Sequence, residues 1–355
     1  MRKYGLLGGG AAAVAIVLLC SGPALAAGGW TVVPSPPPPG SFFTAVAAQS
    51  DTNAWGVGGP QAGTGLIAHW NGTSWSQSPT PSFSQATIML NAASASSPSD
   101  AWAVGRITQP NQNHYRVTTT LALHWNGTAW AAVATPRISG SDLMSVADIS
   151  PTDAYAVGLG GALQWNGTTW TAFAVPAPGG AAPALLNAVA AGSASNVWIA
   201  GLYYDTATAT DEPFTAHFNG TAWSTVPVPV NEGQFFGITV VNPSDTWMVG
   251  YSSSGGSLIE NWNGSSWQVV PNPGTGGLLS VTAASAAGVT AVGGNNQGAS
   301  VLNWNGSAWS TVAVPQVGDT EAFYSTSGAL GGKLTWAFGR STTGQAVSEL
   351  TLLNG

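Results

Sequence analysis

The chain has 355 residues, of which only 6% are charged, and its formal net charge is −7. An acidic chain with so few Lys and Arg residues lacks the basic surface that nucleic acids and anionic membranes attract, which argues against both as main partners. The 47 glycines and 17 tryptophans, together with many small polar residues, are typical of a sheet-rich secreted protein rather than a disordered one.

The first 26 residues resemble a secretory signal peptide. Arg2 and Lys3 supply a basic start, residues 11–19 form an apolar stretch, and Ala24–Leu25–Ala26 forms a small-x-small cleavage site. The apolar stretch is too short for a good membrane span. We therefore expect a signal peptide over residues 1–26, secretion to the extracellular space, and one mature domain over residues 27–355 with no stable membrane span.

Cleavage would remove Cys20, which is the only cysteine of the chain. The mature protein would then have no disulfide, no thiolate nucleophile and no cysteine-based metal site. A lipid anchor on Cys20 is the alternative, and the bulky Leu19 before it argues against that modification.

Two repeats run along the remaining chain. The first is Trp-Asn-Gly-Thr/Ser-x-Trp, with a Phe218 variant and further copies that begin at Trp70, Trp125, Trp165, Trp262 and Trp304. A seventh copy starts at Leu353, and its second half matches Gly29–Pro34 near the other end of the chain. This split copy predicts that the two ends pair with each other.

The second repeat has the form Asp-Ala-Trp-Ala-Val-Gly and recurs about every 47 residues. Its last two copies are degenerate, and its final glycines are Gly58, Gly105, Gly158, Gly201, Gly250, Gly293 and Gly339. A period in this range indicates a repeat architecture, and seven copies in each of two series predict seven repeat units.

Each unit contains the signals of four short strands. An alternating apolar segment comes first, followed by the Asp-Ala-Trp segment, a strand leading into Trp-Asn-Gly, and a strand from the second Trp to a proline. Such units predict an all-β, seven-bladed β-propeller with four-stranded blades, in which the strand around Trp30 closes the last blade.

The Asn-Gly pair predicts a two-residue type I′ hairpin turn, because Asn and Gly tolerate positive φ. In the first unit this turn would pair Trp70 with Thr73 and Ala68 with Trp75. The two tryptophans would then be diagonal neighbours on one face, and we expect them to pack between blades. The six Asn-Gly-Thr/Ser triplets also match the N-glycosylation pattern, but we interpret them as turns.

The combination of Asp-x-Trp-x-Val-Gly with His-Trp-Asn-Gly-Thr-x-Trp resembles a family of secreted bacterial β-propeller repeat proteins. More remotely it is similar to kelch-type and sialidase-type propellers and to the propeller assembly factor of photosystem II. The resemblance covers residues 28–355 and implies the fold without implying an activity. Sialidase-type Asp-boxes are absent in their usual form, and the mature chain lacks the cysteine of kelch-type copper oxidases.

Two of the connections in each unit vary in length and content, namely those between strands two and three and those between successive units. They should emerge on one face, and loops on a rigid scaffold commonly carry function. Charged exposed loops that serve no function are the alternative. The candidate ligand-binding residues on this face are Arg106, His114, Tyr115, Arg116, Arg137, Tyr203, Tyr204, Asp205, Asp211, Glu212, Glu232, Asp319, Glu321, Tyr324 and Arg340.

The sequence favours no catalytic site, no metal site and no cofactor. His69, His124 and His217 share a repeat position that holds Gln or Asn in other units, which indicates a structural polar site. No Ser-His-Asp constellation can be assembled around His114. The recurrent Asp100 and its equivalents are interpreted as turn caps.

The favoured function is that of a secreted, monomeric, non-catalytic scaffold that binds an extracellular protein or a cell-envelope glycan through the variable loops. Two alternatives remain open. A glycan-binding lectin would use Tyr115, Tyr203, Tyr204 and Tyr324 as stacking platforms. A carbohydrate-active hydrolase or lyase would use the loop carboxylates Asp211, Glu212, Asp319 and Glu321.

Overall fold

The computed structural model describes residues 29–34, 41–60, 65–112, 115–180, 183–295, 298–315, 319–343 and 346–354. The predicted signal peptide and His114 lie outside these residues. Within the described ranges, no helix combines the length and the apolar character needed to cross a membrane.

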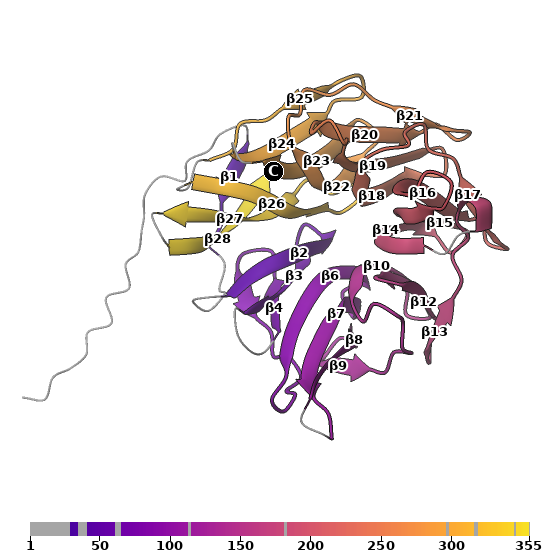
Figure 1. Cartoon of the computed structure of the whole chain (residues 1–355). Coiled ribbons are helices and arrows are strands. Elements are labelled where there is room, and N and C mark those ends of the chain that lie inside the picture. The colour runs from indigo at the N-terminus through magenta and orange to yellow at the C-terminus, as the bar shows by residue number, and fades with distance from the viewer. Residues whose placement is uncertain are drawn as a thin grey trace, which may run out of the picture.

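The protein is an all-β propeller whose four-stranded antiparallel sheets surround a central axis (Figure 1). Six sheets are blades in the strict sense, because each contains four strands that are consecutive in the sequence. Each blade is given from its innermost strand outward, and the first two are β2–β5 (Ser41–Ser50, Asn53–Pro60, Leu66–Trp70, Trp75–Gln77) and β6–β9 (Thr87–Ser97, Asp100–Pro110, Arg116–Trp125, Trp130–Val133). The next two are β10–β13 (Leu143–Ser150, Asp153–Gly158, Gly161–Trp165, Trp170–Phe173) and β14–β17 (Pro183–Ser193, Asn196–Asp205, Thr210–Phe218, Trp223–Val226). The last two are β18–β21 (Gln234–Asn242, Asp245–Tyr251, Ser257–Trp262, Trp267–Val269) and β22–β25 (Gly277–Ser285, Gly288–Asn295, Gly298–Trp304, Trp309–Thr311). A short 3₁₀ helix, η1 (Pro178–Gly180), precedes β14.

A seventh sheet, here called the composite sheet, combines strands from both ends of the chain. It contains β26 (Asp319–Gly328), β27 (Thr335–Thr343), β28 (Ala346–Asn354) and β1 (Trp30–Val32). The expected count of seven blades is therefore corrected: the described residues form six continuous blades, and the seventh repeat copy is completed only by a strand from the other end. In this sheet Trp30, Thr31 and Val32 lie opposite Asn354, Leu353 and Leu352.

The final glycine of the Asp-Ala-Trp-Ala-Val-Gly repeat, which lies in each second strand, is explained by a bulge in the neighbouring innermost strand. In β6 the register with β7 shifts between Leu90 and Ala92. A Cβ atom on Gly105 would consequently lie 2.0 Å from the carbonyl oxygen of Met89, where no side chain fits. The same close approach of a carbonyl oxygen, at 1.8–2.1 Å, occurs at Gly58, Gly158, Gly250 and Gly293.

The hairpin loops differ from the predicted type I′ turn. Trp70 lies directly opposite Trp75, so the loop contains four residues and the two tryptophans are not diagonal neighbours. The Asn71 side chain is the reason, because its Oδ1 accepts hydrogen bonds from the backbone N–H groups of Thr73 and Ser74 at 3.0 Å and from the Thr73 hydroxyl at 2.8 Å. Within this loop, Gly72 is the residue with positive φ, whereas a type I′ turn would require it at Asn71 as well. In all six copies the two flanking aromatic residues lie directly opposite each other across a four-residue loop, so the predicted register was wrong in each.

The repeated aromatic residues pack between neighbouring blades, as the sequence predicts. Trp102 of β7 contacts Trp165 and Trp170 of the next blade, with ring centroids 5.0 and 4.8 Å apart. Edge-to-face pairs of this kind stabilise a structure by about 0.5–1.5 kcal/mol beyond their buried area. The same arrangement is made by Trp55, Tyr155, Trp198, Trp247 and Trp336, each against the hairpin pair of the following blade.

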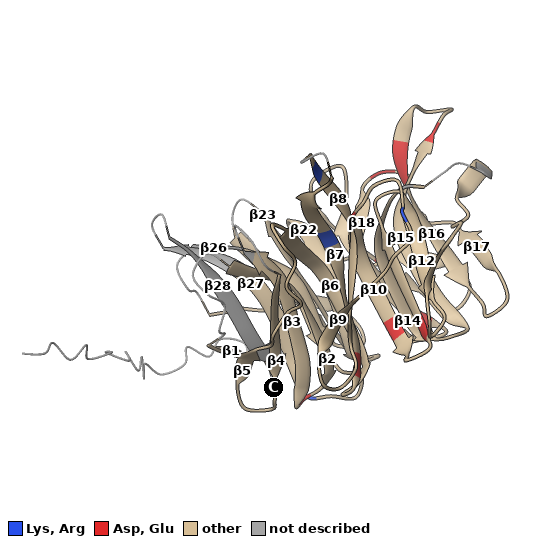
Figure 2. Ribbon diagram, turned by 90° about the horizontal axis from the view of Figure 1, so that it is seen from below, with Lys and Arg blue, Asp and Glu red and all other residues tan. Residues whose placement is uncertain are grey.

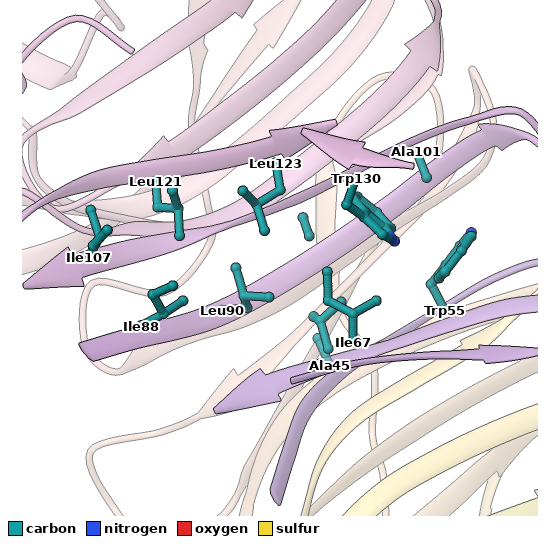
Figure 3. Packing of buried hydrophobic residues seen from close by; sticks show 12 residues of the cluster. Ala45, Trp55, Ile67, Ile88, Leu90, Ala101, Ile107, Leu121, Leu123 and Trp130 are labelled. Carbon is teal, nitrogen blue, oxygen red and sulfur yellow. The ribbon is translucent and has the colours of Figure 1, made fainter. Parts of the chain in front are cut away.

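Figure 3 shows one such joint, where Trp55 of β3 lies near Trp130 of β9 and a row of aliphatic side chains continues toward Leu121 and Ile107. These residues form one buried cluster that belongs to two blades. The core of the protein is thus distributed among the joints rather than placed at a single centre.

The joint between β22–β25 and the composite sheet is built differently. Thr290 stands at the position of the second-strand aromatic residue, and no ring contact links these two sheets among the described residues. Trp30 is fully buried there in a cluster with Val292, Val301 and Phe323. This joint therefore depends on a side chain that comes from the opposite end of the chain.

One apolar cluster of the core contains a carboxyl group. Glu260 of β20 is fully buried, and both carboxyl oxygens lack a hydrogen-bond partner. It lies opposite Met248, which belongs to the apolar cluster between the blades β14–β17 and β18–β21. The equivalent residues in other blades are apolar, for example Leu123 and Leu163. Burial raises the pKa of Glu260 to about 8, so the carboxyl is neutral near pH 7.

Removal of β1 should open the ring. We expect a chain of residues 27–355 that lacks Gly29–Pro34 to melt at a clearly lower temperature, because the composite sheet loses its outer strand and the cluster around Trp30. A synthetic peptide of residues 27–34 should raise the melting temperature again, whereas the same peptide with Trp30→Ala should not. Calorimetry of the two mixtures makes the measurement. A truncated chain that melts like the intact one would disprove the role of β1.

Glu260 should make stability depend on pH. Between its ordinary pKa of 4.5 and its raised pKa of about 8, the unfolded chain is ionised while the folded chain holds the proton. The free energy of unfolding should therefore fall as pH rises through this window, by about 1.4 kcal/mol per pH unit for one proton, and level off above it. Glu260→Gln should remove this contribution in urea titrations, while the exposed-site control Glu232→Gln should keep it. Equal slopes for Glu260→Gln and the unmodified protein would contradict the assignment.

Candidate functional site

One face of the propeller carries the connections that differ between repeats. We define the variable face as the side on which the second strands end, the third strands begin and the chain crosses from one sheet to the next. The opposite side, the turn face, carries the Asn-Gly loops. Figure 2 shows basic residues near β7 and β8 and acidic residues on the projecting β15–β16 hairpin, along the same edge of the molecule.

The β15–β16 hairpin brings five predicted site residues together. Tyr204 pairs with Asp211 and Tyr203 with Glu212 across the two strands, and Asp205 ends β15. The Tyr203 hydroxyl donates to Glu212 Oε2 at 3.0 Å. Burial raises the pKa of Tyr203, and the hydrogen bond and negative charge of Glu212 raise it further. The tip therefore combines an acidic patch with an exposed aromatic ring, that of Tyr204, which is 48% exposed.

The β7–β8 hairpin presents the basic side chains. Arg106 forms an ion pair with the buried Asp142 of the next crossover, and Asn91 Nδ2 donates to Asp142 Oδ1 at 2.7 Å. Burial raises the pKa of Asp142, and Arg106 opposes this shift. Arg116 donates to Thr87 and to the Thr108 carbonyl, both at 3.0 Å. Tyr115 at the tip is 72% exposed.

The remaining predicted residues are spread around the face. Glu232 accepts a hydrogen bond from the Ser253 hydroxyl, and Arg137 is exposed in the crossover between β9 and β10. Asp319 and Glu321 lie on β26 and Arg340 lies on β27, where the structure describes their backbone only. Tyr324 is half-buried and lines the central channel rather than an outer loop. The structure therefore groups the candidates into separate patches on different sheets.

The sequence prediction did not include the central channel. A cavity of about 350 Å³ is lined by the seven innermost strands. These strands do not pair with one another, so their inward backbone N–H groups need other partners. Serine hydroxyls supply some of them: Ser94 accepts from the Asp148 N–H at 3.0 Å, Ser145 from Val189 and Ser325 from Val46, both at 3.1 Å.

The mouth of the channel on the variable face differs from sheet to sheet. One position of each innermost strand lines it, and its occupants are Thr44, Asn91, Met144, Asn187, Phe236, Leu279 and Tyr324. Phe236, Leu279 and Tyr324, on three neighbouring sheets, make one side of the mouth apolar, whereas Met144 is separated from them by Asn187. Phe236 stacks on Tyr251 with ring centroids 5.8 Å apart. The sequence feature that could have indicated this mouth is that the residue type at this one position changes from repeat to repeat, although the rest of the strand is regular.

The arrangement closest to catalytic machinery lies within the blade β6–β9. His124 Nε2 and Asp100 Oδ1 are 2.7 Å apart, and the Ser96 hydroxyl donates to the other oxygen of Asp100. A serine nucleophile requires the histidine between the serine and the acid. Here both groups bind the acid directly, so the order of contacts is not that of a triad.

Comparison with other blades supports a structural role for this histidine position. His69 contacts Asn53 at 2.6 Å, His217 contacts Asn196 at 2.9 Å, and Asn261 donates to Asp245 at 2.8 Å. Burial lowers the pKa of His69 and of His217. These side-chain pairs join the third strand to the start of the second, as expected for a repeated polar site.

The blade β10–β13 also contributes Asp148 to the channel lining. Its Oδ2 accepts from the Ser96 N–H at 3.0 Å, and its Oδ1 is buried without a partner. Burial, followed by the neighbouring charge of Asp100, raises the pKa of Asp148 to about 8. Among the described residues, no group of three or more His, Cys, Asp and Glu side chains is arranged to hold a metal ion.

The comparisons with known proteins support the fold. No family model and no curated protein match the chain. Among solved structures, "YCF48 bound to D1 peptide" aligns with a TM-score of 0.61 and 15% identity over 94% of this chain and 98% of that one. YCF48 from Cyanidioschyzon merolae aligns with a TM-score of 0.60 and 16% identity over 93% of this chain and 98% of that one. "Structure of U3-55K" aligns with a TM-score of 0.63 and 13% identity over 94% of this chain and 100% of that one. At these identities the likeness shows that the chain has the β-propeller fold of these repeat proteins.

Proposed function

We propose that this protein is a secreted, extracellular interaction scaffold that binds a protein partner across the variable face. The observation that carries this proposal is the contrast between the two faces. The Asn-Gly loops of the turn face repeat the same hydrogen bonds in all six copies. The variable face instead carries different side chains on every sheet, as expected for one composite binding surface.

The side chains of the variable face favour a protein partner. Exposed aromatic residues and methionine are enriched where proteins bind each other, and this face exposes Tyr115, Tyr204, Tyr251 and Met144 by 72%, 48%, 37% and 36%. One neighbour of the same fold, YCF48, is described as bound to a D1 peptide, which illustrates that such a propeller can bind a peptide.

The lectin alternative is less well supported by the positions of its tyrosines. Tyr115 and Tyr204 lie on the tips of hairpins from different blades, and Tyr203 is engaged by Glu212. Tyr324 lines the channel. The four rings therefore do not form one stacking platform. Binding of the mature protein on a glycan array at several chemically related sugars would reverse this preference.

Secretion is tested by the processing of the full-length chain. If residues 1–26 are a signal peptide, expression in a bacterial host with an active secretion system should yield extracellular protein whose first residue is Ala27. N-terminal sequencing of the medium fraction makes the measurement. Retention in the cell of a protein that still begins at Met1 would contradict the proposed localisation.

A photo-crosslinking amino acid tests the docking face. Placed at Tyr204 or Met144, it should give discrete crosslinked products with proteins of the cell envelope or culture medium of the native host. The matched control is Ser265 in an Asn-Gly loop of the turn face, which should give none. The mass of each product identifies the partner. Equal products from both faces, or none from the variable face, would contradict the proposal.

A further inference from the structure

A second cavity lies on the variable face, away from the central channel. It has a volume of about 260 Å³ and sits between the third and fourth strands of the blade β6–β9 and the crossover that leads to β10. Its lining consists of four hydroxyl side chains, three aliphatic side chains and one guanidinium. The hydroxyl residues are Thr119, Thr120, Thr135 and Ser141, the guanidinium belongs to Arg137, and Ile138 is the largest of the aliphatic residues.

Arg137 differs from the other two arginines of this region. Arg106 is paired with Asp142, and Arg116 donates to Thr87 and the Thr108 carbonyl. In the described part of the chain, Arg137 makes no hydrogen bond or ion pair with the protein. The nearby Asp142 carboxylate is already bound by Arg106 and Asn91. The Arg137 guanidinium is therefore free to bind an anion from solution.

The segment that carries Arg137 is held against the loop between β11 and β12 of the next blade. The Gly140 N–H donates to the Leu159 carbonyl at 3.0 Å, and the Ser139 hydroxyl donates to the Gly160 carbonyl at 3.1 Å. Ile138 packs against the apolar cluster that contains Trp102. Because these contacts fix the backbone, binding in this pocket requires little ordering of the crossover.

The hydroxyl groups add donors beside the guanidinium. The hydroxyl oxygens of Thr120 and Thr135 are 2.7 Å apart, so one of them donates to the other. The hydroxyl that accepts this bond retains its own proton, which can be donated to a ligand. A planar guanidinium with an adjacent hydroxyl donor suits the two oxygens of a carboxylate, which a guanidinium binds with two parallel hydrogen bonds.

We propose that this pocket binds the carboxylate of a small hydroxylated acid. A single guanidinium balances a single negative charge, and a phosphate dianion would leave a charge uncompensated in a chain whose net charge is −7. The pocket is smaller than the roughly 300–1,000 Å³ of sites for drug-sized molecules. The remaining hydroxyl side chains match a ligand that carries hydroxyl groups of its own, while Ile138 covers its carbon skeleton.

Binding in this pocket does not require the protein partner proposed above, so the two proposals can fail separately. The probe is D-glucuronate, with the neutral D-glucose and inorganic phosphate as comparators at constant ionic strength. Nuclear magnetic resonance of the Arg137 side-chain N–H and the Ile138 methyl groups reports occupancy. We expect saturable shifts with glucuronate, and shifts at least tenfold weaker in apparent affinity with glucose and phosphate.

Three variants test the assignment. Arg137→Gln should weaken glucuronate binding at least tenfold without changing the melting temperature, because this side chain is exposed and unpaired. Thr135→Val should also weaken it, whereas Arg116→Gln, on the same blade, should leave it unchanged. The Ile138 methyl shift remains as the readout in Arg137→Gln. Absence of saturable binding, equal binding of glucose or phosphate, or an undiminished affinity in Arg137→Gln would overturn the proposal.

Discussion

The pairing of β1 with β28 is the interaction on which the rest of the structure depends. Each blade buries its faces only against its neighbours, so an open array would leave two terminal sheets uncovered. The composite sheet places a strand from one end of the chain beside the last strand from the other end. The adjoining joint lacks the aromatic triad found at the others and contains Trp30 instead. Closure therefore fixes both the hydrogen bonds of the composite sheet and the packing of the joint that lacks these ring contacts.

Much of this architecture could be predicted from the sequence because each repeat residue has a local physical cause. The repeat glycine of each second strand is required where a bulged neighbouring strand brings a carbonyl oxygen against it, as at Gly105. The tryptophans recur because six of the seven joints pack a second-strand aromatic residue against the hairpin pair of the next sheet. The split repeat copy also predicted the pairing of β1 with β28, but the expected count of seven blades was wrong, because only six of the seven copies form continuous blades.

The errors and omissions also have physical reasons. The Asn-Gly pair alone is compatible with a two-residue turn, but the side chain of Asn71 makes three hydrogen bonds within its loop and selects a four-residue one. The candidate site was drawn from loops, so residues inside regular strands were overlooked. Met144 and Phe236 line the channel mouth from such strands. Contacts between distant segments, such as Arg106 with Asp142, cannot be derived from repeat spacing.

The turn face of the ring is the same in each repeat and stabilises the fold, whereas the variable face carries the proposed binding sites. The turn face repeats one set of hydrogen bonds, while the variable face combines an acidic, tyrosine-bearing hairpin, a half-apolar channel mouth and a pocket with an unpaired arginine. These features lie on different sheets, so their relative positions depend on the closed ring. A partner or ligand that contacts two of them can bind only if closure keeps the sheets in register.

Native-state hydrogen exchange of the β1 amides is the most direct measurement of this central claim. If β1 is an integral strand of the composite sheet, the amide protons of β1 that bond to β28 should exchange only through global unfolding. Their protection should then match that of amides in β7. Exchange of the β1 amides at the rate of a frayed terminus, while β7 stays protected, would show that the ring holds together without this strand and would contradict the account.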